Sequence, residues 1–425
     1  MSVTQNQGAV EIDRLVFDAV FDSSESVRNE LRKQIRQIAR DCGVELKSIQ
    51  GLYDAIGRGE AGPFTVPAMN IRGMAYDTAR AAFRAARKLD VGAFVFEIAR
   101  SEMGYTDQVP DEFVICMLAA AIKEGFRGPL MVQGDHFQVN AKNYTKDPEA
   151  ELQKVRDLID AALQAGFYQI DVDTSTLVDL SKATLEEQQR VNFEQAAMFT
   201  AYIRSREPAG VTVSVGAEIG EVGGQNSTPA EFRAFMSGYL SDLQKRGGGL
   251  KGISKISIQT GTSHGGTVAA DGSIADVKID FPALEAISKI AKEEYGLAGA
   301  VQHGASTLPE EMFGKFVEAG ACEVHLATAF QNLMFESKHL PANFRAKLYA
   351  WIHSDCAAER KAKDSDEQFL YKTRKKTYGP FKKEWWSLPS EAKRGLGAEL
   401  QQRFELLFER LAVTGTTGVV AKFVK

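Results

Sequence analysis

Eight short apolar runs that alternate with longer helical patterns constrain the fold of this chain more than any other sequence feature. The runs are rich in Val, Ile and Phe and occupy residues 64–71, 93–99, 129–136, 168–175, 211–220, 253–265, 299–306 and 322–330. The stretches between them, such as residues 150–167, carry apolar residues at three- and four-residue spacing, as amphipathic helices do. This alternation favours parallel βαβ units. Eight units within about 270 residues predict an α/β fold, a closed (β/α)8 TIM barrel, with an open doubly wound sheet as the alternative.

The two ends of the chain lack this alternation and read as helical. We therefore expect a helical N-terminal extension over residues 1–63, a catalytic barrel over 64–335 and a helical C-terminal extension over 336–425. The last of these contains a basic stretch at residues 371–386, YKTRKKTYGPFKKEWW. A solvated surface is the favoured explanation of its charges, and a site for phosphate or an acidic partner is the alternative.

Composition excludes several function classes. The 425 residues have a formal net charge of −5, so the chain lacks the overall positive charge that attracts nucleic acid or anionic membranes. Its four cysteines form no Cys-x-x-Cys pair, which disfavours a thiolate metal cage or a disulfide framework. No apolar segment reaches membrane-spanning length, and the first twenty residues lack the pattern of a secretion signal. We therefore expect a cytoplasmic protein without a nucleic-acid or membrane partner.

Three of the six histidines lie within two residues of a glycine at the ends of predicted strands: His136, His264 and His303. In a (β/α)8 barrel the carboxyl ends of the strands meet at one mouth, whatever their separation in the sequence. A single histidine at a strand end is more often a hydrogen-bonded structural residue. Three imidazoles with an open fourth position, however, form a known catalytic zinc arrangement, so the set predicts a divalent metal site.

Carboxylates follow the same strands. Glu218 and Asp173 end the fifth and fourth runs, where each would bind the metal, hold a metal-bound histidine or, alternatively, cap a helix. Asp135 directly precedes His136, and strand alternation would turn the two side chains apart unless the strand end bends. If the strand bends there, Asp135 becomes a candidate general acid or base.

Small residues gather at the same predicted mouth. They follow the sixth and seventh runs, at Gly261, Gly265, Gly266, Gly304, Ser306 and Thr307. Exposed backbone N–H groups and hydroxyls there are able to cradle a phosphate, and loops after the last strands are a frequent phosphate site in this fold. Ordinary turns are the alternative explanation. The position beside two candidate metal ligands favours a metal-bound phosphorylated substrate.

Five motifs together resemble the class II, metal-dependent fructose-bisphosphate aldolases. In chain order they are GDH (134–136), GFYQIDVDTS (166–175), AEIGEVGG (217–224), GTSHGG (261–266) and HGAS (303–306). The resemblance covers about residues 50–335 and implies a (β/α)8 barrel without a Schiff-base lysine. It implies reversible cleavage of a ketose bisphosphate, fructose 1,6-bisphosphate above all, to dihydroxyacetone phosphate and glyceraldehyde 3-phosphate.

The resemblance also implies roles for individual residues. His136, His264 and His303 would hold Zn²⁺, or Co²⁺ or Fe²⁺ in its place, with Glu218 as an additional or alternate ligand. Asp135 would exchange the proton on the C4 oxygen of the sugar. The remaining expected contacts are with substrate or phosphate, from Asn70, Gly265, Gly266, Gly304, Ser306, His325 and Thr328. Asp173 would support a metal-bound histidine or a second metal. We expect a homo-oligomer, a dimer or a tetramer, as the functional state.

The eighth run departs from the family pattern. Where the family commonly has Asn-x-Asp-Thr-Asp, this chain keeps Thr328 but has His325, Ala327 and Ala329 in place of the asparagine and both acids. We expect His325 to enter the mouth and replace the asparagine as a hydrogen-bond partner of substrate. The alternative is a core histidine that packs against the eighth helix.

Two further departures affect the substrate. Residues 225–232, QNSTPAEF, lack the acids usual at the start of the loop after the fifth strand, and Ala99 replaces a serine near the end of the second. The alternatives to a fructose-bisphosphate aldolase are therefore an aldolase for a related sugar, such as tagatose bisphosphate, or a non-catalytic aldolase-like subunit. A zinc hydrolase is a weaker alternative, because the first strand lacks the His-x-His pair with which barrel metallohydrolases commonly begin.

Overall fold

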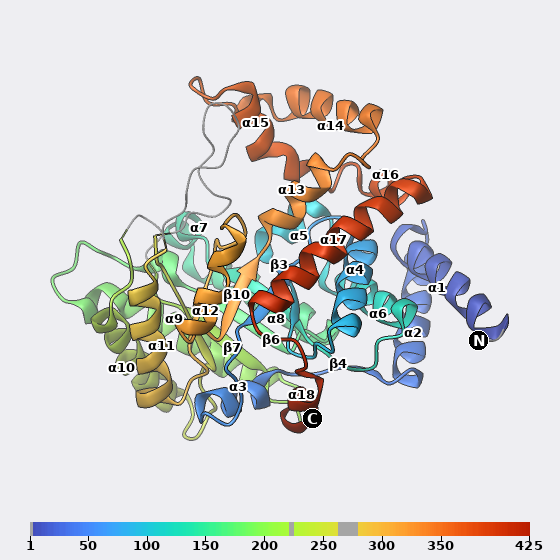
Figure 1. Ribbon diagram of the computed structural model, residues 1–425. Helices are drawn as coiled ribbons and strands as arrows, with labels where there is room; N and C mark the ends of the chain where they lie inside the picture. Colours follow the sequence, from blue (N-terminus) through green and yellow to red (C-terminus); the bar gives the residue numbers. More distant parts are fainter. Residues whose placement is uncertain (1–2, 221–224, 262–278) are drawn as a thin grey trace.

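The computed structural model describes residues 3–220, 225–261 and 279–425, and its centre is a closed barrel of eight parallel strands (Figure 1). The strands are β2 (Val66–Asn70), β3 (Val95–Ala99), β5 (Val132–Gln138), β6 (Gln169–Asp173), β7 (Ser214–Glu218), β8 (Lys255–Ile258), β9 (Ala300–Gln302) and β10 (Glu323–Leu326). Their order around the barrel follows the chain, and β10 closes the ring against β2. The predicted (β/α)8 barrel is therefore confirmed, and the open sheet is excluded.

Helices cover the outside of the barrel. Those that follow the strands are α4 (Ala75–Lys88), α6 (Pro110–Glu124), α8 (Pro148–Ala165), α9 (Leu185–Arg206), α10 (Pro229–Arg246), α11 (Phe281–Tyr295) and α12 (Gly314–Glu318). Local sequence sets where they begin. In α9 and α10 a threonine caps the first turn and a glutamate three residues later reaches back to the threonine N–H, which satisfies N–H groups that the helix leaves unpaired.

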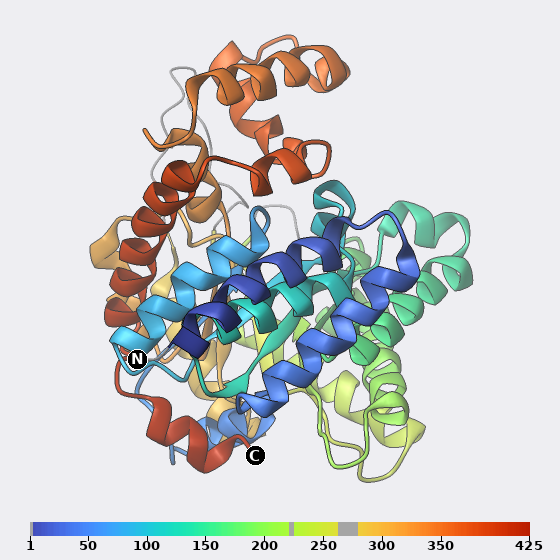
Figure 2. The same cartoon turned by 90° about the vertical axis from the view of Figure 1, so that its right-hand side faces the viewer.

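The N-terminal residues pack on the barrel's helical layer. Figure 2 shows α1 (Val3–Phe21) and α2 (Glu25–Asp41) lying across α6, and Arg36 of α2 forms an ion pair of 2.6 Å with Asp111 of α6. One part of this segment is not helical. Strand β1 (Val44–Leu46) pairs in parallel with β4 (Gly128–Leu130) as a separate two-stranded sheet, which the sequence pattern did not predict.

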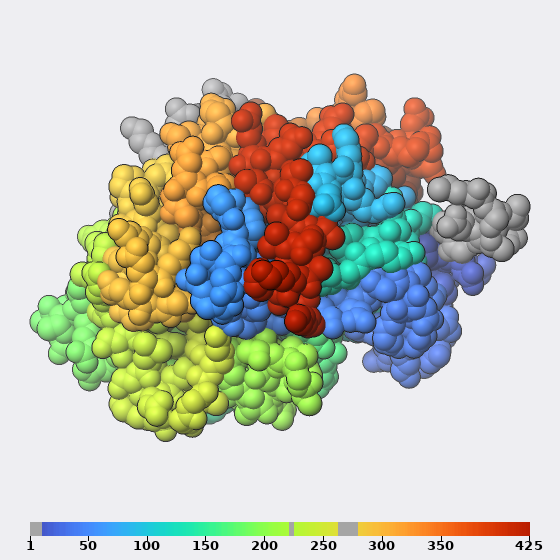
Figure 3. Space-filling view, turned by 60° about the horizontal axis from the view of Figure 1, so that its bottom comes forward, coloured from blue at the N-terminus to red at the C-terminus, as the bar shows by residue number. Residues whose placement is uncertain are grey.

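The C-terminal residues contribute to both ends of the barrel. Helix α17 (Ser390–Arg410) lies along α4 in the outer layer, and α18 (Thr417–Phe423) lies beside α3 (Gln50–Gly57) at the amino ends of the strands, where Figure 3 shows the two together. Above the mouth lie α13 (Thr328–Glu336), α14 (Ala342–Asp355), η3 (Ala357–Glu359), α15 (Asp366–Thr373), η4 (Arg374–Thr377) and α16 (Lys382–Trp386) (Figure 1). This extension therefore reaches the end of the barrel at which substrate is expected.

A search of the described part of the chain for helices long and apolar enough to cross a membrane finds none.

Candidate active site

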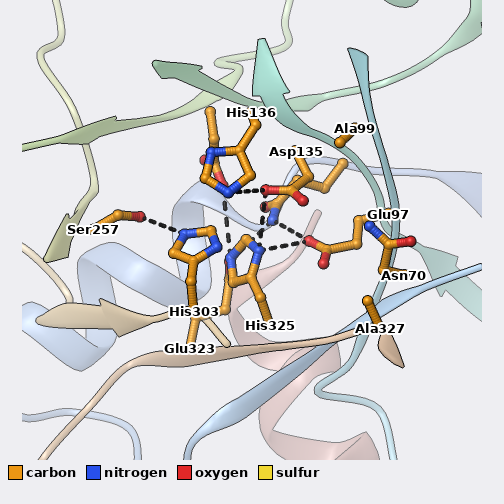
Figure 4. A network of polar contacts seen from close by, with 12 residues as sticks. Asn70, Glu97, Ala99, Asp135, His136, Ser257, His303, Glu323, His325 and Ala327 are labelled. Atoms are coloured by element: carbon orange, nitrogen blue, oxygen red, sulfur yellow. Dashed lines mark hydrogen bonds and ion pairs between the residues drawn. The ribbon is translucent and has the colours of Figure 1, made fainter. Parts of the chain in front are cut away.

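A cavity of about 610 Å³ lies at the carboxyl ends of the strands. Most barrel strands contribute a side chain to it, either from their last residues or from the residues that directly follow. Among the lining residues are Asn70, Glu97, Asp135, His136, Asp173, Glu218, His303, Ser306, His325 and Thr328. Figure 4 shows how Asp135 and three of the histidines converge. The barrel thus brings together residues that lie far apart in the sequence, such as Asn70 and Thr328.

The end of β5 bends, so that Asp135 and His136 both face the cavity. Its pairing with β6 shifts register between Gly134 and Phe137, and His136 has a left-handed backbone with φ of 42°. The ring of Phe137 folds over Gly134, where a Cβ atom would come within 2.4 Å of it. The resulting distance from His136 Nε2 to Asp135 Oδ1 is 3.8 Å. A β-bulge re-aims side chains in this way.

Three imidazole rings form a row across the mouth. The ring centre of His303 lies 4.4 Å from that of His136 and 4.0 Å from that of His325. Asp173 Oδ2 lies 3.0 Å from His136 Nδ1. Ser257 Oγ lies 3.0 Å from His303 Nε2, as Figure 4 shows. These contacts fix the orientation of the rings, as the partners of metal-binding histidines commonly do.

Carboxylates surround His136 closely. Glu218 Oε2 lies 3.4 Å from His136 Nδ1, beside the contact with Asp173. Burial, together with the nearby Asp173, raises the pKa of Glu218 to about 7. Burial opposes the charged form of His136, but Asp135, Asp173 and Glu218 hold its pKa well above the ordinary value. The site therefore calls for positive charge, which a protonated imidazole or a divalent cation supplies.

The donor set fits a divalent metal ion. His136, Glu218 and His303 each offer a ligand atom, and the three atoms lie within 4.8 Å of one another. Asp135, His303 and His325 form a second such group. Imidazole nitrogen and carboxylate oxygen are donors that zinc prefers. Two of the three histidines expected at the metal are thus together, while the third, His264, lies at 262–278, outside the described residues.

His325 lies inside the barrel and lines the cavity, with 5% of its side chain exposed. Its Nε2 is 2.6 Å from Glu323, and its Nδ1 is 3.0 Å from Glu97 and 3.2 Å from Asp135 (Figure 4). Burial opposes charge on the ring, but Glu97 and Asp135 raise the pKa of His325 well above its ordinary value. The ring therefore lies among carboxylates that favour its charged form, and it does not pack against an outer helix.

A buried lysine lies below this row, and sequence reasoning missed it. The Lys255 ammonium donates to Asp171 at 2.9 Å, to Gln133 at 2.8 Å and to Glu323. Burial opposes its charge, but Asp171 and Glu323 raise its pKa above the ordinary lysine value. An ammonium held in this way is a poor nucleophile, so the geometry gives Lys255 no role as a Schiff-base lysine. The only sequence signal was a lysine in the middle of an apolar strand.

Small and hydroxyl residues form another part of the cavity wall. Gly304 has φ of 70°, and Ser306 Oγ accepts from the backbone N–H of Ala327 at 2.6 Å. The Thr307 hydroxyl is buried and has no hydrogen-bond partner among the described residues. Strand β10 ends at Leu326, and Thr328 is already the first residue of α13. The predicted strand run at 322–330 is therefore too long at its carboxyl end. The expected phosphate residues Gly265 and Gly266 lie outside the described residues.

Asn70 and Arg72 line the cavity at the end of β2. Asn70 Nδ2 donates to Glu102 Oε2 at 2.6 Å, and Arg72 donates to the other oxygen of Glu102 at 2.7 Å. Asn70 Oδ1 is buried without a hydrogen-bond partner among the described residues. Glu102, in α5 (Arg100–Thr106), thus holds both side chains at the cavity wall. Its role was not visible in the sequence, because it depends on the turn between β3 and α5.

Comparison with known proteins identifies the family of the chain and structures with a similar fold. The family model described as "Fructose-bisphosphate aldolase class-II" matches residues 52–378. Among solved structures, the fructose-bisphosphate aldolase from Campylobacter jejuni is 16% identical with a TM-score of 0.50, covering 88% of this chain and 96% of its own. The fructuronate-tagaturonate epimerase UxaE from Cohnella laeviribosi is 13% identical with a TM-score of 0.59, covering 82% and 81%. At these identities the structural likeness supports the fold alone.

Proposed function

Because the chain belongs to the class II fructose-bisphosphate aldolase family, we propose that it is a metal-dependent aldolase that reversibly cleaves a ketose bisphosphate. The favoured substrate is fructose 1,6-bisphosphate, which gives dihydroxyacetone phosphate and glyceraldehyde 3-phosphate. The observation that carries this proposal is the row of His136, His303 and His325 across the mouth, with Asp135 beside it. We also expect a cytoplasmic homo-oligomer, a dimer or a tetramer.

The metal would be held by His136, His303 and Glu218, together with His264, whose place is a prediction from the sequence. Zinc is favoured by the donor set, with Co²⁺ and Fe²⁺ as alternatives. When bound, a divalent ion supplies Lewis-acid stabilisation of the negative charge that develops on the ketone fragment. Asp173 keeps the His136 ring in place through its contact of 3.0 Å with Nδ1.

Asp135 is the proposed general acid and base at the C4 hydroxyl of the sugar. Burial opposes its charge, but His136 and His325 hold the pKa of Asp135 well below the ordinary value. It is therefore ionised and able to accept the hydroxyl proton as the C3–C4 bond breaks. His325, 3.2 Å from Asp135 Oδ1, keeps this carboxylate oriented and is a proposed hydrogen-bond partner of substrate.

The phosphate of the three-carbon ketone is assigned to the cradle formed by Gly304, Ser306, Thr307 and Thr328, with Gly265 and Gly266 as further expected contacts. The unpartnered Thr307 hydroxyl and the first N–H groups of α13 support this assignment, because both favour an anion. Asn70 Oδ1 is a proposed acceptor for a sugar hydroxyl.

Cleavage assays on fructose and tagatose 1,6-bisphosphates test the proposal. Dihydroxyacetone phosphate release is followed with a coupled dehydrogenase, on protein as purified, after chelation, and after addition of Zn²⁺, Co²⁺ or Fe²⁺. We expect release that chelation abolishes and metal restores. Interconversion of the two sugars without release would instead support an epimerase, the activity named for one of the similar structures. Neither reaction with any metal would support a non-catalytic subunit.

A further inference from the structure

One lysine of the basic stretch 371–386 lies in the active-site cavity. Lys375, in η4 of the C-terminal extension, lines the same cavity as Asp135 and His303 and is half-buried. Its neighbour Lys376 instead forms an ion pair with Glu359 and does not line the cavity. The stretch is therefore not uniformly a solvated surface, which was the favoured explanation of its charges.

The fold fixes Lys375 at this place through its neighbours in the chain. Arg374 donates to Asn332 at 2.6 Å and to Glu336 at 2.8 Å, both in α13. On the other side, the ring of Tyr378 lies so close to Gly73 that a Cβ atom there would come within 2.1 Å of it. The backbone N–H of Gly379 donates to the carbonyl of Tyr105 at 3.1 Å. The segment that carries Lys375 is thus anchored to α13, to the β2–α4 connection and to α5.

The polar groups around Lys375 are incompletely paired. Its ammonium lies 5.5 Å from the ring centre of Tyr105 and has no hydrogen bond or ion pair with the described residues. The Tyr105 hydroxyl is buried and likewise has no hydrogen-bond partner among them. Arg72 lines the same cavity and adds a second positive charge there, although its own guanidinium is paired with Glu102 and donates to Gln331 at 3.2 Å. Buried donors are normally satisfied, so this group is suited to an oxyanion.

We propose a second anion site in this cavity, formed by Lys375, Tyr105 and Arg72. The cradle at Ser306 and Thr307 would hold the phosphate of the ketone fragment, and the second site would bind the anionic group at the opposite end of the substrate. The ligand chemistry is an oxyanion, a phosphate or a carboxylate, on the terminal carbon of the aldehyde fragment. This inference rests on the proposed function and deepens it, because it makes the C-terminal extension part of substrate recognition. Lys375 would thereby select substrates that carry charge at both ends.

The electrostatics of Lys375 agree with this placement. Burial, together with the nearby Arg72, lowers the pKa of Lys375. Glu102 is one negative charge near the two cations Lys375 and Arg72. A bound oxyanion would add the further negative charge that the pair favours.

Substitution of Lys375 by methionine tests the inference, with Lys376→Met as the matched control in the same helix. The holoprotein is assayed on three ketose 1-phosphates whose far end is a phosphate, a carboxylate or a neutral hydroxymethyl group. For the anionic end that it recognises, Lys375→Met should raise KM by about 10- to 100-fold, as loss of a charged hydrogen-bond partner does. KM for the neutral-ended sugar should stay unchanged, and Lys376→Met should alter none of the three.

The anionic substrate that binds more weakly to Lys375→Met than to wild type shows whether the site recognises phosphate or carboxylate. Lys375→Arg should restore most of that affinity, and Tyr105→Phe should weaken it to a smaller degree. Equal changes in KM for charged and neutral ends, or no change with either anion, would overturn the inference.

A binding measurement separates this inference from the proposed function. Calorimetric titration of the holoprotein with inorganic phosphate should show two bound ions per chain, one of which is lost in Lys375→Met and kept in Lys376→Met. This result would support the site even if no sugar is cleaved. Identical phosphate binding by wild type and Lys375→Met would contradict the site even if cleavage is observed.

Discussion

Asp135 and His136 are consecutive in the sequence, yet both side chains face the active-site cavity, with His136 Nε2 at 3.8 Å from Asp135 Oδ1. In a regular strand they would point to opposite faces. The register shift after Gly134 and the left-handed backbone of His136 bring them together. The proposed proton-transfer group and a proposed metal ligand therefore occupy one short bend, and changes to this bend should affect both.

The substitution Gly134→Ala tests the packing of the bend. Its Cβ atom would come within 2.4 Å of the Phe137 ring, so either the ring or the strand end must move. We expect a loss of about 1 to 3 kcal/mol in the free energy of unfolding, as for other overpacked sites, and reduced metal affinity. Chemical denaturation measures the first. Gly418→Ala, which meets no atom within 4 Å and lies in α18, is the control and should keep or slightly raise stability. Equal stability of the two variants would contradict the role of Gly134.

Asp135→Asn should preserve the fold and the metal but lower turnover by about 10²- to 10⁴-fold, the range for loss of a general acid or base. The amide is nearly the same size as the carboxylate and does not accept the hydroxyl proton. Steady-state kinetics and elemental analysis of one preparation check both statements. Unchanged turnover would show that Asp135 has only a structural role.

His325→Phe should lower both stability and catalytic efficiency. It removes one partner of Glu323 at 2.6 Å, which keeps Lys255, and the closest cationic partner of the buried Asp135 at 3.2 Å. Weakening the pairing of a buried carboxylate costs about 1 to 3 kcal/mol. His325→Asn keeps one donor and should retain more activity, with an altered preference between fructose and tagatose bisphosphates. If neither variant changes catalytic efficiency or sugar preference, His325 has no part in substrate recognition.

The barrel was predictable because its signal is local and repeated. Each of the eight strands overlaps a predicted apolar run, although β5 continues to Gln138, two residues beyond the run at 129–136, and closure follows from their number and order. Strand β1 was missed, and β4 was merged with β5 into the one predicted run at 129–136, since three residues carry too little pattern to be recognised as a separate strand.

The site was predictable only in part. Strand ends identified His136, His303 and Asp135 as residues of one mouth, but the layer of Lys255 and Glu323 below them depends on which inward-facing side chains meet across the barrel. Spacing along the chain does not contain that information. Lys375 illustrates the same limit, because a run of basic residues looks solvated until tertiary packing buries one of them.

Substrate affinity should fall at alkaline pH through Lys375. Burial and Arg72 lower its pKa, so the ammonium loses its proton at a lower pH than an ordinary lysine, and oxyanion binding is present below that pKa and lost above it. The other charged or titratable groups facing Lys375 are Glu102, Tyr105, Lys376 and Glu359. A sugar phosphate, with a second pKa of about 6, is already fully ionised there. We expect an alkaline fall in kcat/KM for the bisphosphate that is absent in Lys375→Met. The same fall in both proteins would assign it to another group.

The central claim is that a metal held at the histidine row is required for activity, and paired histidine variants test it most directly. His303→Ala removes a proposed ligand from the mouth, whereas His353→Ala removes an exposed histidine of α14 that lies outside the cavity. Metal content by elemental analysis and turnover of fructose 1,6-bisphosphate should be measured on the same preparations. The account predicts that His303→Ala loses most of its metal and nearly all turnover, while His353→Ala keeps both at the wild-type level. Full metal content and turnover in His303→Ala would contradict it.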